Sequence, residues 1–238
     1  MVREAASLLQ EIGADFPAAA DNEYFMGVSA KAKLLGGDFA EAASQFQKGI
    51  KIGSGKRNIL LSKYSRWEAL IRCGKAQEAE TLLEQALAQA KSAGISGLVP
   101  AIYAQFVLLC LKRGDVARER EWENQRRDIK QQLDLPFEQD AFLLVAESEF
   151  DAAIRSVTPF LSSATEEKIN KENEIEALIV LARAWHGKGD PAQGNDYLTR
   201  AAALMLSTSC RREQDRYDET RHLLDGAASG GVGLDGLM

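Results

Sequence analysis

Proline is scarce in this chain, and so are cysteine and histidine. The five prolines in 238 residues favour long helices over a loop-rich fold. The three cysteines, Cys73, Cys110 and Cys210, form no CxxC pair, so they indicate isolated thiols in a reducing, cytoplasmic compartment and not a disulfide framework. His186 and His222 are the only histidines, and neither has a cysteine or carboxylate cluster beside it at metal-ligand spacing. We therefore expect no bound metal ion.

Long apolar runs and an excess of positive charge are also missing. The most hydrophobic run, Leu98 to Leu111, spans about 14 residues, whereas a membrane-spanning helix needs about 20. The N-terminal stretch MVREAASLLQEIGADFP is charged and amphipathic and has no apolar core of signal-peptide length. The formal net charge of −6 and the pI near 5.2 argue against a nucleic-acid backbone as the main partner. These features predict a soluble protein that binds neither membrane nor nucleic acid through this domain.

One pattern recurs along the chain. In Gly37 to Ile52, GDFAEAASQFQKGIKI, the residues Phe39, Ala43, Phe46 and Ile50 lie at helical offsets that place them along one side of a helix. Similar stretches follow turn residues at Gly74, Gly114, Ser148 and Gly189. The intervals between the turns are 37, 40, 34 and 41 residues, close to the period of helical-hairpin repeats. The sequence therefore predicts an all-α stack of about five helical hairpins.

The two ends of the stack depart from the repeat. Residues Val2 to Phe16 read as a second helix with no first helix before it, so they form either a capping helix or the remnant of a longer array. The charged segment Arg211 to Leu224 suits a capping helix. We expect the array to cover residues 1–225 and the glycine-rich tail, residues 226–238, to be flexible.

Local signals set several boundaries. Asp21 is expected to cap a helix over Glu23 to Leu35. Pro159 is expected to end or kink a helix near Thr158. Core positions in the first hairpin are predicted at Phe25, Val28, Ala32 and Leu35.

The third hairpin has an unusual second helix. Arg118 to Lys130 is dense in charges of alternating sign, and Glu119 stands where the other repeats keep a small residue. A solvated helix explains this composition, and a homodimer or partner seam is the alternative.

The repeat resembles a known family. A Gly-Asp inner turn, a small residue inside the second helix and a large apolar residue after it are typical of tetratricopeptide repeats. The small residues are Ala42, Ala79, Ala153 and Gly194, and the large ones are Phe46, Leu83, Val157 and Leu198. The stretch IEALIVLARAWHGKGDPAQGNDYLTRAAALM is also similar to the helical effector domain of MalT-like bacterial transcription regulators.

The resemblance implies a right-handed α-solenoid whose first helices line a concave groove for a peptide or partner protein. Placing each first helix by its core stripe leaves eight side chains that face this groove: Tyr64, Glu68, Arg72, Leu108, Lys112, Phe142, Arg183 and His186. Leu108 and Phe142 would form its apolar floor, unless the superhelix or the glycine-rich tail covers Leu108. Family members that bind acidic chaperone tails use a Lys-Asn pair, but the matching positions here are Gly27 and Lys31.

Catalytic and cofactor motifs are not found. GSGK at Gly53 to Lys56 has neither the earlier glycine nor the Ser or Thr of a phosphate loop, and GVGLDG at Gly231 to Gly236 has no room for a following helix. No GxSxG or HExxH pattern occurs. We therefore expect a non-enzymatic protein-interaction scaffold without a cofactor. The alternative is a regulatory, effector-sensing domain of a larger signalling or transcription-regulator protein.

Overall fold

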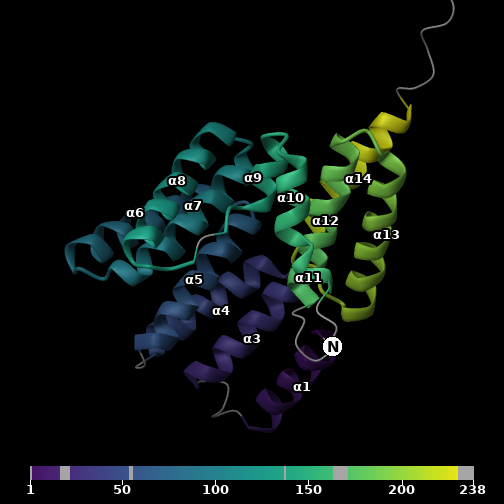
Figure 1. Cartoon of the computed structure of the whole chain (residues 1–238). Coiled ribbons are helices and arrows are strands. Elements are labelled where there is room, and N and C mark those ends of the chain that lie inside the picture. Colours follow the sequence, from purple (N-terminus) through teal and green to yellow (C-terminus); the bar gives the residue numbers. More distant parts are fainter. Residues whose placement is uncertain (1, 17–21, 54–55, 137, 163–170, 230–238) are drawn as a thin grey trace, which may run out of the picture. The chain divides into compact units, whose positions relative to one another are not determined.

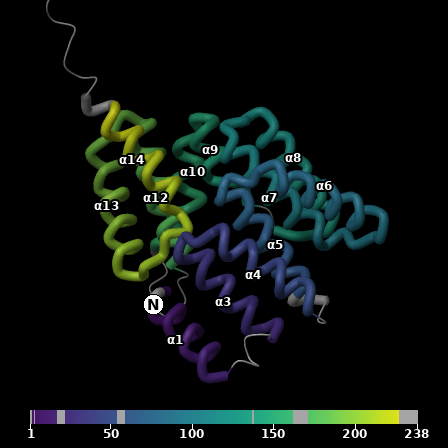
Figure 2. Tube along the Cα trace, turned by 180° about the vertical axis from the view of Figure 1, so that it is seen from behind, coloured from purple at the N-terminus to yellow at the C-terminus, as the bar shows by residue number. Residues whose placement is uncertain are grey.

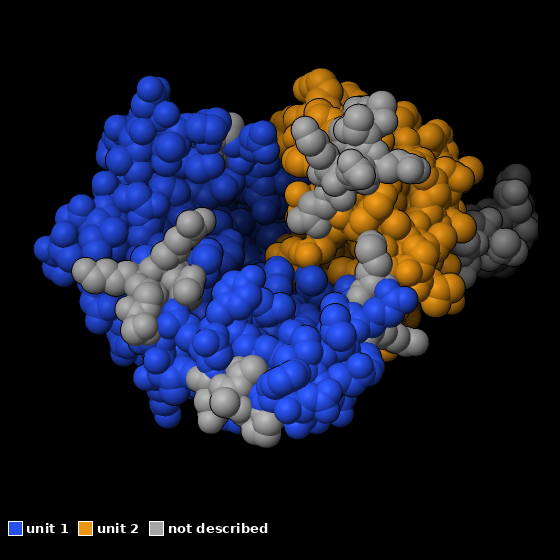
Figure 3. All heavy atoms as spheres, turned by 90° about the horizontal axis from the view of Figure 1, so that it is seen from below, with its two compact units in different colours: residues 1–143 blue, residues 144–238 orange. Residues whose placement is uncertain are grey.

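Helices account for the regular structure of the residues that can be described. The computed structural model describes residues 2–16, 22–53, 56–136, 138–162 and 171–229, and within these ranges it contains helices and no strand. The all-α prediction is confirmed for these residues. The chain forms two compact units, Met1–Leu143 and Leu144–Met238, which are blue and orange in Figure 3.

Unit 1 is a series of helices joined by short connections (Figure 1). They are α1 (Val2–Asp15), α3 (Glu23–Gly36), α4 (Phe39–Ile52), α5 (Lys56–Arg72), α6 (Ala76–Ser92), α7 (Val99–Arg113) and α8 (Val116–Gln132). A short 3-10 turn, Ser96–Leu98, precedes α7, and α9 (Ala141–Ala146) spans the boundary between the units. From α3 to α8 each helix packs against the next, and α5 also contacts α3 and α7. The first helices of successive hairpins, α3, α5 and α7, are therefore neighbours, as Figure 2 also shows.

The turns lie where the repeat pattern predicts them. All five turn residues adopt left-handed backbone, with φ between 62° and 89°: Gly37, Gly74, Gly114, Ser148 and Gly189. At the first turn, the N–H groups of Gly37 and Asp38 donate to the carbonyls of Leu34 and Lys33 and so satisfy the end of α3. Four of the five are glycines because a Cβ disfavours this conformation.

The core of unit 1 depends on small residues at the closest helix contacts. Ala42 and Ala79 are fully buried, and the large side chains that follow them, Phe46 and Leu83, are 3% and 0% exposed. Glu119 occupies the equivalent position on α8 and is also fully buried. A small side chain such as alanine lets two helix backbones approach closely, as at Ala42 and Ala79.

An aromatic contact holds α8 on α7. The Trp122 ring stacks on Phe106, with centroids 4.3 Å apart, and lies 5.5 Å from the ring of Tyr103. Offset stacking of this kind adds to the free energy gained from burying the rings. Trp122 therefore anchors a helix whose other side chains are mostly charged.

Unit 2 is built around α12, whose middle is buried on nearly all sides. Its helices are α10 (Phe150–Val157), α11 (Pro159–Ser162), α12 (Lys171–Gly187), α13 (Pro191–Thr208) and α14 (Gln214–Ser229). The break between α10 and α11 falls at Thr158, as Pro159 predicts. Both α13 and α14 pack on α12, and Figures 1 and 2 show the three helices side by side.

The approach of α13 to α12 is closer than an alanine would allow. A Cβ at Gly194 would lie 2.9 Å from the carbonyl oxygen of Ala182 on α12. Backbone cannot move out of the way as a side chain can, so glycine is required at this position. The sequence identifies the position as small, and the structure explains why it is glycine and not alanine.

Three local expectations differ from the structure. The cap of α3 is Asn22, whose Oδ1 accepts from the N–H groups of Tyr24 and Phe25; Asp21 lies outside the described residues. The buried side of α3 carries Ala30 and Leu34, whereas Val28 is 39% exposed. α3 contacts α1, α4 and α5, so several of its sides are partly covered and apolar spacing alone does not select the deepest one.

The C-terminal helix also extends further than expected. α14 begins at Gln214 and continues to Ser229, so it includes Gly226. Residues 230–238, which hold GVGLDG and most of the predicted flexible tail, lie outside the described residues.

Candidate functional site

Two of the predicted groove residues on α5 form a buried ion pair. The guanidinium of Arg72 donates to Glu68 at 3.0 Å, and the two side chains are only 2% and 4% exposed. Tyr64, one turn earlier, is partly buried against the core. Because both side chains are buried, a ligand would reach Glu68 and Arg72 only if this side of α5 were uncovered.

The predicted apolar floor is largely occupied by the core of unit 1. Phe142 on α9 is 4% exposed, and Leu108 on α7 is partly buried against the core cluster. Lys112, one turn after Leu108, is partly exposed. Of these three residues, Leu108 and Lys112 retain surface that a partner could contact.

Large apolar side chains on α3 and α5 are also exposed. Tyr24 and Val28, four residues apart on α3, are 72% and 39% exposed, and Leu61 on α5 is 58% exposed. Leu61 lies on the side of α5 that carries Tyr64 and Glu68, because the spacings of three and seven residues keep it there. We call Tyr24, Val28, Leu61, Leu108 and Lys112 the first-helix surface of unit 1.

Sequence reasoning missed three members of this surface. The apolar spacing predicts Val28 in the core, and it makes no prediction for Tyr24 or Leu61. Leu61 could have been found by extending the Tyr64 to Arg72 stripe by one turn toward the N-terminus. Tyr24 has no such signal, because its exposure depends on which helices flank α3.

In unit 2, the chain's own last helix contacts the predicted groove residue Arg183. Its guanidinium donates to the Thr220 hydroxyl at 2.6 Å and to Glu219 at 3.0 Å, both on α14. Thr220 is fully buried in this contact. His186 is partly buried, and its Nδ1 has no hydrogen-bond partner among the described residues. α14 therefore occupies the side of α12 around Arg183.

The charged helix α8 uses much of its charge to hold the chain that follows it. Glu123 accepts from the N–H of Asp140 at 2.8 Å and from Arg126 at 2.6 Å. Lys130 donates to the carbonyl of Pro136 at 2.8 Å. These contacts tie the connection between α8 and α9 to the surface of α8. The sequence alone does not decide whether the charges of α8 face solvent or a partner. These contacts within the chain explain part of that charge pattern.

A second charge cluster joins α6 to the turn between α7 and α8. Glu80 lies 2.8 Å from Arg113 and 3.3 Å from Arg118. The hydrogen bond from Arg113, together with the positive charge of both guanidinium groups, lowers the pKa of Glu80 below its ordinary value. Glu80 is therefore ionised at neutral pH and acts as a structural acceptor.

The cysteines show no sign of catalytic activation. Burial raises the pKa of Cys110 to about 11 and also raises the pKa of Cys210, so both are protonated at neutral pH. The thiol of Cys73 donates to the carbonyl of Leu70. All three are free thiols.

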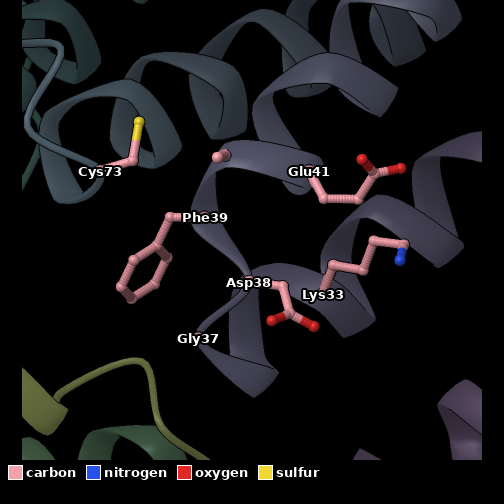
Figure 4. A pocket seen from close by; sticks show the side chains of 7 residues that line it. Lys33, Gly37, Asp38, Phe39, Glu41 and Cys73 are labelled. Carbon is pink, nitrogen blue, oxygen red and sulfur yellow. The ribbon is translucent and has the colours of Figure 1, made fainter.

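A shallow hollow of about 450 Å³ lies at the first inner turn (Figure 4). It is lined by Lys33, Gly37, Asp38, Phe39, Ala40, Glu41 and Cys73. Figure 4 shows the side chains of Lys33 and Glu41 leaving the turn on one side and the Phe39 ring on the other. The hollow is open, and its side chains diverge, so no set of groups converges on a common point.

The described residues contain neither a metal-binding cluster nor a membrane-spanning helix. Within the described ranges, no group of three or more His, Cys, Asp or Glu is placed to hold a metal ion. None of the helices described is both long and apolar enough to cross a bilayer.

Comparisons with known proteins concern the fold alone. No protein-family model matches the chain, and no curated protein does so. Among solved structures, the chain is similar to the crystal structure of BtubC (BKLC) from P. vanneervenii, with a TM-score of 0.50 and 14% sequence identity. The alignment covers 100% of this chain and 92% of that chain. The likeness supports a helical-repeat-like, all-helical fold.

Proposed function

We propose that this chain is a non-enzymatic scaffold that binds an extended segment of a partner protein. In this proposal unit 1 is a tetratricopeptide-like stretch of right-handed α-solenoid, and α3, α5 and α7 line one groove. The observation that carries the proposal is the exposure of large apolar side chains on these neighbouring helices. Tyr24 and Leu61 keep 72% and 58% of their surface in water. Apolar groups that gather on adjacent elements are typical of protein-interaction sites.

The energies suit a modest affinity. Burying one such side chain stabilises a complex by about 1.5–3 kcal/mol. Two or three anchors contribute about 3–9 kcal/mol before the cost of association and of ordering the partner is subtracted, so the apolar contacts alone support a dissociation constant no tighter than roughly the millimolar range.

A cytoplasmic location fits the cysteine chemistry. Isolated cysteines that form no disulfide are typical of proteins in reducing compartments. We include this location in the proposal.

Selection from a random peptide library tests the binding surface. We expect the wild-type chain to enrich peptides with spaced apolar residues. The double variant Val28→Asp, Leu61→Asp should bind an enriched peptide more than about tenfold less tightly, because each carboxylate would have to be desolvated. Both positions are at least 39% exposed, so the helical content should not change.

Leu206→Asp is the matched control. Leu206 on α13 is 83% exposed and lies in unit 2, so this variant should bind the peptide as the wild type does. Equal peptide affinity for the double variant and the wild type would show that this surface is not the binding site.

A further inference from the structure

α14 is fixed to α12 by charges of opposite sign. Arg212, in the turn before α14, donates to Glu172 at 3.1 Å. Arg216 on α14 lies 3.5 Å from Glu176, one turn further along α12. Both acceptors belong to α12, and Arg216 itself is only 7% exposed. These two pairs set basic groups on the α14 side against acidic groups of α12, whereas the pair between Arg183 of α12 and Glu219 of α14 has the opposite polarity.

The apolar part of this contact is a small cluster around Leu224, to which Ala182 of α12 and Tyr217 of α14 also belong. Leu224 is the fully buried large side chain of α14, and it packs near Gly194 and Leu198 of α13. Further polar contacts run from Arg183 to α14. Charge pairing specifies which helix is accepted but does not require that helix to belong to the same chain.

The turn before α14 holds a non-glycine residue in left-handed backbone, as the inner turn at Ser148 also does. Ser209 adopts φ 57°, in the left-handed region where four of the five inner turns place glycine. The chain has neither glycine nor proline from Asn195 to Asp225, so no residue there prevents α13 from continuing directly into α14. Straightening the turn would relieve the strain at Ser209 and add helical hydrogen bonds.

We propose that α14 exchanges between two copies of this chain. In the exchanged form α13 and α14 join into one helix, and the α14 of each copy docks on the α12 of the other. The pairs from Arg216 to Glu176 and from Arg183 to Glu219 are kept, because these residues lie within α12 and α14 and meet in the same geometry. Arg212 joins the continuous helix one turn before Arg216 and on the same side of it. Short, strained hinges favour such exchange. The occupant of the α12 surface is then a second copy of this chain, and this inference does not depend on the proposed function.

Complementary charge reversals test the exchange. One variant carries Glu172→Arg and Glu176→Arg, and the other carries Arg212→Glu and Arg216→Glu. Each alone sets like charges against each other in both the closed and the exchanged form. In an equimolar mixture, exchange pairs the basic α14 of the first with the acidic α12 of the second, and the reversed pair likewise. We expect light scattering after size exclusion to show heterodimers only in the mixture.

The chain with all four substitutions is the matched control. Its charges on α12 and α14 are complementary within one molecule, so it should be as helical as the wild type. It should also pair less strongly with either two-substitution variant than those two variants pair with each other. A mixture that stays monomeric while this control folds normally would overturn the proposal.

A second arm changes the hinge and leaves the charges intact. Ser209→Gly removes the left-handed strain from the closed form, so this variant should have a lower dimer association constant than the wild type. Ser209→Ala keeps the strain and favours the continuous helix, so its association constant should be higher. The association constants of the two variants should differ roughly fivefold for each hinge, and therefore about 25-fold for a dimer with two hinges. Equal dimer fractions for the two variants, measured at one protein concentration, would contradict the hinge mechanism.

Discussion

Glu80 illustrates how a single carboxylate can join three elements. Its side chain on α6 is held between Arg113 at the end of α7 and Arg118 on α8. Glu80 is 8% exposed, so its charge depends on these two partners for stabilisation. The pKa of Glu80 is lowered by the hydrogen bond from Arg113 first and by the charges of both arginines in addition.

Removing Arg113 should therefore destabilise the folded chain at neutral pH. We expect Arg113→Ala to lower the free energy of unfolding by about 1–2 kcal/mol, since it removes a hydrogen bond to a charged group. Because the folded-state pKa of Glu80 is lowered, the contribution of this pair is present above the ordinary carboxyl pKa of 4.5 and is lost as the pH falls through the folded value. Urea unfolding at pH 7 and in acid measures both effects.

Arg127→Ala provides the comparison for this prediction. Arg127 lies on the neighbouring helix with its side chain 51% exposed, and its contact with Asp128 spans 3.8 Å. An exposed pair of this kind contributes little, so the variant should unfold like the wild type at both pH values. Equal losses for the two variants would show that Glu80 does not depend on Arg113.

At the scale of elements, one close contact decides how α12 and α13 pack. Gly194→Ala should lower the free energy of unfolding by about 1–3 kcal/mol, because the new Cβ would lie 2.9 Å from the Ala182 carbonyl oxygen. Gly226→Ala in α14 is the matched control, since nothing lies within 4 Å of its Cβ position. The control should be neutral or slightly stabilising because alanine favours helix. Thermal unfolding followed by circular dichroism compares them, and equal melting temperatures would refute the close-contact explanation.

The hairpins were predictable because their signals are local. Ser148 was identified as a turn residue from the repeat interval, and it adopts the same left-handed conformation as the glycines. The small residues of the second helices were identified in the same way, and Ala42, Ala79 and Ala153 are fully buried. Spacing along one segment suffices for such features.

The side of a helix that faces solvent was not predictable at several positions. Val28 is exposed although it belongs to an apolar stripe, because the helices that flank α3 cover Ala30 and Leu34 more completely than the side that carries Val28. Arg183 is bound by Thr220, a residue 37 positions later, and no local pattern reveals a pairing over that distance. The eight predicted groove residues remain a prediction, and their geometry favours Leu108 and Lys112 over the buried Glu68 and Phe142.

At the scale of the whole chain, the division into two units leads to a prediction about how a perturbation spreads. Leu83 is fully buried in the core of unit 1, and Gly194 is buried in unit 2. Leu83→Ala should cost about 2–5 kcal/mol through the cavity it leaves. Since contacts concentrate within each unit, we expect each substitution to lower amide protection mainly in the helices around it.

Hydrogen exchange read helix by helix measures this spread. Leu83→Ala should speed exchange in α6 and α7 and leave α12 and α13 unchanged, and Gly194→Ala should do the reverse. In helical arrays, stability comes from each hairpin and its nearest neighbours, so a local loss need not reach distant helices. A uniform loss of protection across all helices in either variant would mean that the chain unfolds as one cooperative body. The two outcomes can be distinguished because α6 and α7 lie in unit 1 whereas α12 and α13 lie in unit 2, so each variant serves as the control for the other.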